Sequence, residues 1–286
     1  MDAAIAKGFP DPREHTSALL RRGKAKKSLA DFKGAINDYT AVIELEGAPR
    51  DLVALALVNR GVVKGRQGDS QGALADYTAV IELEGAPKDE VARALFNSGF
   101  TKDLQGDSQG ALADYTTVIE LEGAPKDEVA RALVNRGIAK GQQGDSEREL
   151  ADYMAAIDLG VTTGGNLMLD AAHAALAASW RRNDQNAARM VMEKFSFALG
   201  KIVKESAIEI SLGFLRTLAS PEMKDGWPFA WRILAVRAQP EVAEALGILE
   251  PVCDVLSSKD RSLLNALPPE QREFVQLVLT RFETER

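Results

Sequence analysis

The sequence predicts an all-α protein in which short helical repeats stack side by side as an α-solenoid. A fixed step of 38 residues separates two sets of markers: Tyr39, Tyr77, Tyr115 and Tyr153, and Gly23, Gly61, Gly99 and Gly137. Between these markers apolar residues recur at helical spacing, and no useful length of sequence alternates as a strand would. A solenoid offers a long curved surface and usually no deep catalytic pocket, so the period favours a binding scaffold.

The second and third repeats are near copies of each other. Residues 68–95 and 106–133 differ at a single position, where Ala79 is replaced by Thr117. The first repeat has drifted, since Ala30 stands where the later repeats have the glycine of a Gly-Asp-Ser turn. Such close copies indicate duplication within the chain.

Each repeat is predicted to form two helices. In the second repeat we expect Pro49 in the first helical turn, with Asp51 adding negative charge near that N-terminus. Gly68 permits the end of this helix, and Asp69 is a good N-cap for the next one. Residues 85–87, Gly-Ala-Pro, stop the second helix and begin the cycle again.

Small residues mark the predicted contact between the two helices of a pair. Gly61 and Ala73 lie one in each helix, where we expect the backbones to approach closely, and Tyr77 is expected to pack into the next repeat. A glycine, an alanine twelve residues later and an aromatic residue four further on resemble the tetratricopeptide repeat family. The third repeat matches in the same way, but the fourth has Glu149 at the alanine position, which predicts a looser pair.

This resemblance covers residues 14–160 as four repeats and implies a right-handed solenoid. The family's unit is about 34 residues, and the four extra residues correspond to about one helical turn, which we place at Asp51–Ala54. After a predicted linker at 160–165, residues 166–202 are expected to form a degenerate fifth repeat. Residues 203–286 are expected to form a helical C-terminal capping or interaction region, since terminal repeats need a closing surface.

Composition excludes several classes of function. The net charge of −7 argues against nucleic-acid binding, and the single Cys253 excludes an internal disulfide framework. The sequence shows neither a signal peptide nor a run long enough to cross a membrane, so a cytoplasmic protein is expected. Two separated histidines and one cysteine cannot form an ordinary zinc site, and no phosphate loop or nucleophile elbow occurs. We therefore predict no catalytic residue, no metal and no cofactor.

The resemblance implies that the first helix of each pair lines a concave groove. The implied lining residues are Leu20, Lys24, Lys27 and Ser28; Val58, Val62 and Arg66; Phe96, Phe100 and Leu104; and Val134, Ile138 and Gln142. The middle of this set is apolar, and an exposed apolar stripe of that extent usually marks an interaction site. The alternative is that the C-terminal helices or a second copy of the chain cover it.

Asparagines recur on the same helices. Asn59, Asn97 and Asn135 each precede the repeat glycine by two residues, and an amide side chain presents a donor and an acceptor together. A ladder of such amides could hold the backbone of an extended peptide. The alternative is that each asparagine makes only local contacts within its own helix.

The N-terminal end of the array is basic. Five cations lie within seven residues: Arg21, Arg22, Lys24, Lys26 and Lys27. Such a patch is expected to favour the acidic end of a peptide and to speed encounter, although a run of this kind is more often simply solvated.

The function expected from the sequence is non-catalytic: a scaffold or adaptor that binds a peptide or helix of a partner protein in its groove. An alternative is a structural or regulatory subunit of a larger assembly, either homo- or hetero-oligomeric, that docks through the C-terminal helices. Trp227 and Trp231, four residues apart, would then serve as an aromatic anchor. Self-association is compatible with either interpretation.

Overall fold

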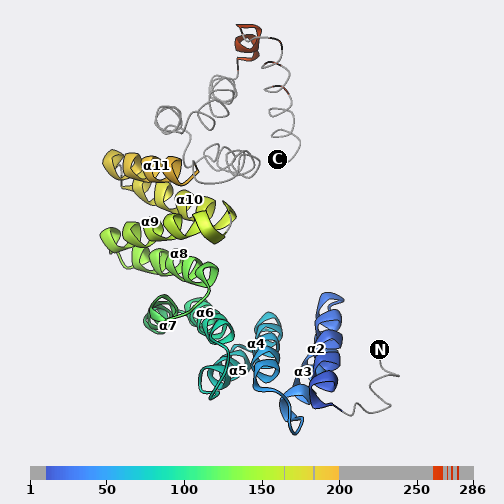
Figure 1. Ribbon diagram of the computed structural model, residues 1–286. Helices are drawn as coiled ribbons and strands as arrows, with labels where there is room; N and C mark the ends of the chain where they lie inside the picture. Colours follow the sequence, from blue (N-terminus) through green and yellow to red (C-terminus); the bar gives the residue numbers. More distant parts are fainter. Residues whose placement is uncertain are drawn as a thin grey trace. The chain divides into compact units, whose positions relative to one another are not determined.

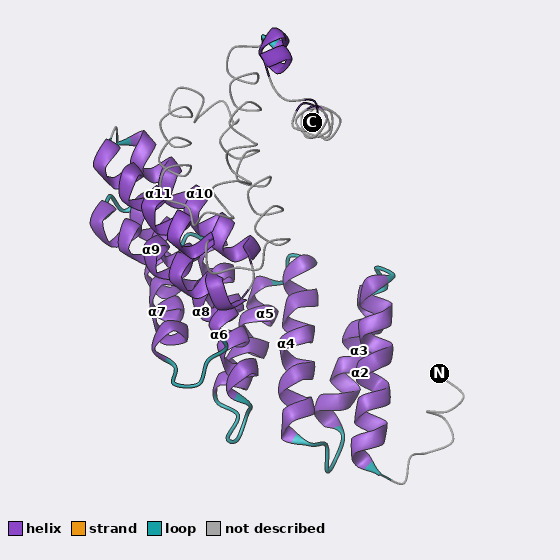
Figure 2. Ribbon diagram, turned by 45° about the horizontal axis from the view of Figure 1, so that its top comes forward, coloured by secondary structure: helices purple, strands orange, loops and turns teal. Residues whose placement is uncertain are grey.

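The computed structural model describes residues 11–163, 165–182, 184–199 and 260–266, with the single residues 269, 272 and 276. Within these ranges the chain is helical and contains no strand (Figures 1 and 2). Consecutive helices pack against one another in pairs, so the predicted all-α array of helix pairs is confirmed.

The chain divides into two compact units, Met1–Ala139 and Lys140–Arg286. The first unit holds three complete helix pairs and most of the next first helix. Its helices are α2 (Pro12–Ser28), α3 (Phe32–Glu44), α4 (Arg50–Arg66), α5 (Ser70–Ile81), α6 (Lys88–Leu104), α7 (Ser108–Glu120) and α8 (Lys126–Gln142), the last of which ends in the second unit. Each first helix has 17 residues and each second helix 12 or 13, as expected if the extra turn lengthens the first helix.

The described part of the second unit contains three further α-helices and one short 3₁₀ helix. They are α9 (Ser146–Thr163), α10 (Gly165–Arg181), α11 (Gln185–Leu199) and η1 (Arg261–Ala266). Helices α10 and α11 pack together, and both contact α9. Most of the C-terminal region 203–286, including Trp227 and Trp231, lies outside the described residues.

The turn within each pair follows the predicted chemistry. Gly68 ends the first helix with a φ of +84°, a conformation that glycine adopts without steric cost. Asp69 then caps the next helix, because its side chain accepts a hydrogen bond of 2.9 Å from the backbone N–H of Gly72. In the first repeat Ala30 takes the same left-handed conformation, with a φ of +59°. Among the described residues, Ala30 is the one non-glycine residue with a positive φ.

The loop between pairs differs from expectation by one residue. Pro49 and Pro87 are the N-cap residues of α4 and α6 and do not belong to the first turn. Both adopt an extended backbone, and their carbonyls accept the first helical hydrogen bonds, as Pro87 does from the N–H of Val91 at 3.0 Å. A cap residue needs no N–H of its own, so proline fits here as well as it fits the first turn.

The predicted linker at 160–165 is mostly helical. Helix α9 continues to Thr163, and α10 already begins at Gly165. The fourth repeat lacks the Gly-Ala-Pro sequence that ends the earlier second helices, so no proline interrupts the helix here. Packing of α9 against α10 then outweighs the modest helix propensity of Gly160 and Val161.

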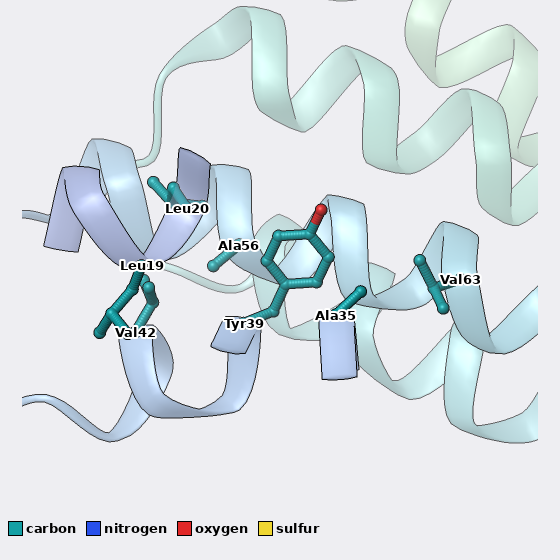
Figure 3. Packing of buried hydrophobic residues seen from close by; sticks show 7 residues of the cluster. All are labelled: Leu19, Leu20, Ala35, Tyr39, Val42, Ala56 and Val63. Atoms are coloured by element: carbon teal, nitrogen blue, oxygen red, sulfur yellow. The ribbon is translucent and has the colours of Figure 1, made fainter. Parts of the chain in front are cut away.

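In each of the three complete pairs of the first unit, a tyrosine ring is seated on a glycine of the facing helix. A Cβ added to Gly61 would lie 2.6 Å from Cε1 of Tyr77, and the same contact recurs between Gly23 and Tyr39. Figure 3 shows the cluster around the first ring: Leu19, Leu20, Ala35, Tyr39, Val42, Ala56 and Val63. Ala56 and Val63 belong to the next repeat. The tyrosine therefore packs within its own pair as well as against its neighbour, and the glycine is small because the ring occupies its side-chain space.

An aspartate that precedes each ring forms ion pairs with the facing helix, and these pairs were missed from the sequence. Asp76, directly before Tyr77, is 2.7 Å from Arg60 and 2.9 Å from Lys64, both on the facing helix. The same arrangement joins Asp38 to Arg22 and Lys26 in the first repeat. The third and fourth repeats keep the lysine pairs, Lys102 with Asp114 and Lys140 with Asp152. The detectable signal was an aspartate before every repeat tyrosine.

The fourth repeat replaces the small alanine with a held carboxylate. Glu149 is buried, and its oxygens accept hydrogen bonds from Arg182 at 2.7 Å, Arg181 at 3.3 Å and the Tyr153 hydroxyl at 3.4 Å. Gly141 makes room for it, since a Cβ there would lie 2.5 Å from the Glu149 carboxyl. A charge-assisted cluster therefore fills the position where the other repeats have alanine, while the looser packing of this pair stays a prediction.

Replacing Ala30 with glycine is expected to stabilise the protein by about 1 kcal/mol, because an L-residue in the left-handed region costs about that much. The matched reverse change is Gly68→Ala, which should destabilise it by a similar amount. No atom lies within 4 Å of the added Cβ of Gly68, so only backbone conformation changes. Denaturant unfolding followed by circular dichroism measures the free energy of unfolding of both variants. Equal stability of Ala30→Gly and wild type would contradict the assignment of strain.

Removing the Tyr115 hydroxyl is expected to stabilise the fold, and removing that of Tyr153 to destabilise it, each by about 1 kcal/mol. In the described part of the chain the buried Tyr115 hydroxyl has no hydrogen-bond partner, whereas the Tyr153 hydroxyl donates to Glu149. Thermal unfolding of Tyr115→Phe and Tyr153→Phe gives the comparison. Destabilisation of both variants to the same extent would show that the hydroxyl environments do not differ in this way.

Candidate protein-interaction surface

The first helices of the first unit lie along its inner side. Helix α2 packs against α4 and α4 against α6, while the described second helices α3, α5 and α7 make no comparable contacts with one another (Figure 2). Helices that touch their equivalents in the next repeat occupy the shorter, inner side of a curved stack. The surface that the first helices expose is therefore the candidate interaction surface.

The structure separates the predicted lining residues into exposed and buried groups. Exposed or half-buried are Lys24, Lys27, Ser28, Val62, Arg66, Phe100, Leu104, Val134, Ile138 and Gln142. Val58 and Phe96 are only 2% and 5% exposed, and Leu20 is likewise buried. These three side chains belong to the core clusters, because the helix turns them toward its partner helix, so they do not line the surface.

An apolar strip crosses three successive first helices. We define it as Val62, Phe100, Leu104 and Ile138. Val62, Phe100 and Ile138 occupy the same repeat position, directly after the repeat glycine, and Leu104 lies one turn beyond Phe100 on α6. Phe100 is 46% exposed, Leu104 74% and Ile138 39%, which is far above the core residues beside them.

The asparagine ladder is largely engaged in local contacts. The Asn59 side-chain amide donates to the carbonyl of Leu55 at 2.7 Å, and its oxygen accepts from Lys27 at 3.1 Å. Asn135 donates in the same way to the carbonyl of Arg131 at 3.0 Å. Among the described residues the Asn97 side chain makes no hydrogen bond. The local alternative thus holds for Asn59 and Asn135, and Asn97 is the ladder member with both groups available.

The predicted basic patch is smaller than its sequence suggests. Arg22 and Lys26 are bound to Asp38 and turn away from the inner surface. A different set, which we call the basic cluster, comprises Lys24, Lys27 and Arg66. Lys24 and Lys27 are three residues apart on α2, and Lys27 donates to Asn59 on α4, the helix that carries Arg66. Burial, then Arg66 and then Lys24 lower the pKa of Lys27. None of them forms an ion pair with a described carboxylate, in contrast to Arg22 and Lys26.

A ladder of ion pairs runs beside the strip on α6 and α8. Glu90 pairs with Arg93 at 3.1 Å, Arg93 approaches Glu128 at 3.9 Å, and Glu128 pairs with Arg131 at 3.0 Å. The Arg131 guanidinium also lies 4.1 Å from the centre of the Phe96 ring. The repeated Glu-x-x-Arg of the near-identical repeats was the available sequence signal, and it was missed.

Both carboxylates of this ladder are electrostatically unusual. Burial raises the pKa of Glu90 and of Glu128, and the neighbouring arginines only partly offset it. Lys24 also acts to lower the pKa of Glu90, so the basic cluster and the ladder are within electrostatic reach on the inner surface. The candidate surface therefore combines an apolar strip, an unpaired basic cluster and a self-compensated ion-pair ladder.

Two negative observations apply to the described residues alone. None of their helices is both long and apolar enough to span a bilayer. Nor do these residues contain a group of three or more histidine, cysteine, aspartate or glutamate side chains placed to hold a metal ion.

No family model matches the chain, and no curated protein matches it. Among solved structures, the chain is similar to the crystal structure of MamA protein, with 19% identity over 65% of this chain and 91% of that one and a TM-score of 0.47. It is also similar to a tetratricopeptide repeat protein from Parabacteroides merdae ATCC 43184, with 15% identity over 94% of this chain and 98% of that one and a TM-score of 0.48.

Ionisation of Glu128 is expected to oppose folding. Its folded pKa lies above the unfolded value of about 4.3, so its contribution to stability is complete below that pH and is lost as pH rises through the folded pKa. The free energy of unfolding of wild type minus that of Glu128→Gln should therefore fall as pH rises from below about 4.3 and then level off.

Urea unfolding of both proteins at a series of pH values measures this difference. Glu120→Gln, which replaces an exposed glutamate on α7, is the control for loss of a solvated carboxylate. A difference that increased with pH across the same window would show that Arg93 and Arg131 outweigh burial.

Proposed function

We propose that this protein is a non-catalytic interaction scaffold that binds a segment of a partner protein on the inner surface of its first unit. The supporting observation is the apolar strip, which repeats at one position over three consecutive first helices. Single exposed apolar residues are normal on protein surfaces, and Leu29 and Ile81 are examples here. Exposed apolar residues that recur at one position on successive helices, with a second one a turn away, favour a binding surface instead.

The strip is large enough to anchor a partner. Full burial of one Phe, Leu, Ile or Val side chain contributes about 1.5–3 kcal/mol, and the exposed parts of these four would supply a fraction of that each. Phe100 and Leu104 are adjacent on α6 and form the most exposed pair, so they would act as the central anchor. Val62 and Ile138 would extend the contact toward the neighbouring helices.

Charge favours an acidic partner segment. The basic cluster lies beside the start of the strip, because Arg66 follows Val62 by one turn of α4. Peripheral charges of this kind raise the association rate and select against basic partners more than they add affinity. Asn97 is placed to donate or accept one hydrogen bond next to Phe100. A cytoplasmic location and the absence of a cofactor remain expectations from the sequence.

Phe100→Ala is expected to weaken partner binding tenfold or more, because truncating a central aromatic anchor typically costs about 2 kcal/mol. Asn97→Ala should weaken it less, by the value of about one hydrogen bond. Affinity purification from the source cell with mass spectrometry identifies the partner, and calorimetric titration measures the dissociation constants. Ile81→Ala, on second helix α5, is the control of similar exposure to Ile138. Unchanged affinity of the double variant Asn97→Ala/Phe100→Ala would remove the inner surface as the site.

A further inference from the structure

Resting on the function proposed above, we infer that the segment bound on the apolar strip is an amphipathic α-helix with acidic residues along one flank. An extended peptide is the alternative that the hydrogen-bond pattern disfavours. The inference combines the engaged state of the asparagines, the placement of the apolar side chains and the unpaired basic cluster.

The inner surface offers few free hydrogen-bonding groups to a bound backbone. An extended segment brings its backbone N–H and C=O groups to the surface, and groups buried there without partners cost free energy. One side-chain N–H of Asn59 and one of Asn135 already donate to carbonyls of their own helices, and the Asn59 oxygen accepts from Lys27. These local bonds orient both amides along their own helices and leave the complete donor and acceptor set to Asn97, so the ladder is a poor partner for an extended backbone along its length. An α-helix satisfies its backbone internally and needs only apolar contact from this surface.

The spacing of the strip residues matches the spacing of residues on one face of an α-helix. Val62, Phe100 and Ile138 stand at one position on three successive first helices, and neighbouring packed helices are about 8–10 Å apart. Residues seven apart on an α-helix share a face and are separated by about 10.5 Å. A bound helix crossing the first helices would therefore place apolar residues at i, i+3 or i+4, and i+7 against the strip. The Phe100 and Leu104 pair broadens the strip where the centre of that face would lie.

The basic cluster at one end of the strip favours acidic residues on the bound segment. Lys24, Lys27 and Arg66 form no ion pair with a described carboxylate, although Lys24 lies within longer electrostatic reach of Glu90. Lys24 and Lys27 are three residues apart on α2, and Lys27 bonds Asn59 on α4, the helix that carries Arg66. Burial and both other cations lower the pKa of Lys27. The neighbouring cations Arg22 and Lys26 are neutralised by Asp38, and the arginines on α6 and α8 by Glu90 and Glu128. Cations without an ion-pair partner therefore gather at one end of the strip. Glutamates or aspartates flanking the apolar face of the bound helix would relieve this repulsion.

The test selects binders to the full-length protein from two libraries in parallel. One library displays randomised residues on the surface of a stable helical scaffold, and the other displays random linear dodecapeptides. The helical library is expected to yield binders with apolar residues at i, i+3 or i+4, and i+7 and with flanking acidic residues. Their affinity, measured by fluorescence anisotropy, should fall at least tenfold for Phe100→Ala/Leu104→Ala and at least threefold for Lys24→Glu. Ile81→Ala should leave it unchanged, and circular dichroism confirms that each variant is folded.

The other outcomes distinguish an error about the helical form of the bound segment from an error about the location of the binding surface. Linear binders that depend on Phe100, with no helical binders that do, would overturn the helix and leave the interaction surface intact. Failure of both libraries to yield binders that depend on Phe100 or Leu104 would overturn the surface as well. Light scattering of the pure protein tests whether a second copy of the chain occupies the strip. A dimer that dissociates in Phe100→Ala/Leu104→Ala would show that it does, and this result would also overturn the inference.

Discussion

The seating of a tyrosine ring on a glycine of the facing helix is the contact on which the rest of the described structure depends. The ring fills the space that a Cβ at Gly61 would need, and this fixes how closely the two helices of a pair approach. Burial, with a further effect of the adjacent aspartate, raises the pKa of Tyr39 and Tyr77 to about 12, so the rings stay neutral in the core. Each ring also borders the next repeat, so one contact sets both the pair and the stacking between pairs.

The aspartate before each ring, buried at Asp38 and Asp76, links this core to the surface. Asp38 and Asp76 each hold an arginine and a lysine from the facing helix. A buried ion pair contributes little net stability, but loss of one partner leaves an uncompensated charge, so it fixes the relative position of the helices. The pairing with Asp38 engages Arg22 and Lys26 and leaves the basic cluster at one end of the strip. The distribution of positive charge on the inner surface therefore depends on which cations the aspartates of the core bind.

Sequence reasoning identified the repeat and its turns because these are local properties. Gly68 and Asp69 are read correctly from a short motif, since a left-handed turn and an N-cap each depend on a few residues. Its errors have the opposite character. Val58 and Phe96 were predicted to line the surface, but helical spacing alone does not distinguish a residue at the edge of the apolar face from one at its centre. Glu149 was read as a poor substitute for alanine, because its partners Arg181 and Arg182 lie more than thirty residues away.

The sequence by itself determined the all-α class, the 38-residue step, the two helices of each unit and the glycine, alanine and tyrosine positions that join them. Only the tertiary structure decided which first-helix residues are exposed, which cations are already paired and which asparagines still have free amide groups. These properties depend on neighbours that are far apart in sequence: Asp38 is sixteen residues from Arg22, and Lys27 is thirty-two residues from Asn59. Burial and charge compensation arise between helices, so no local period can specify them.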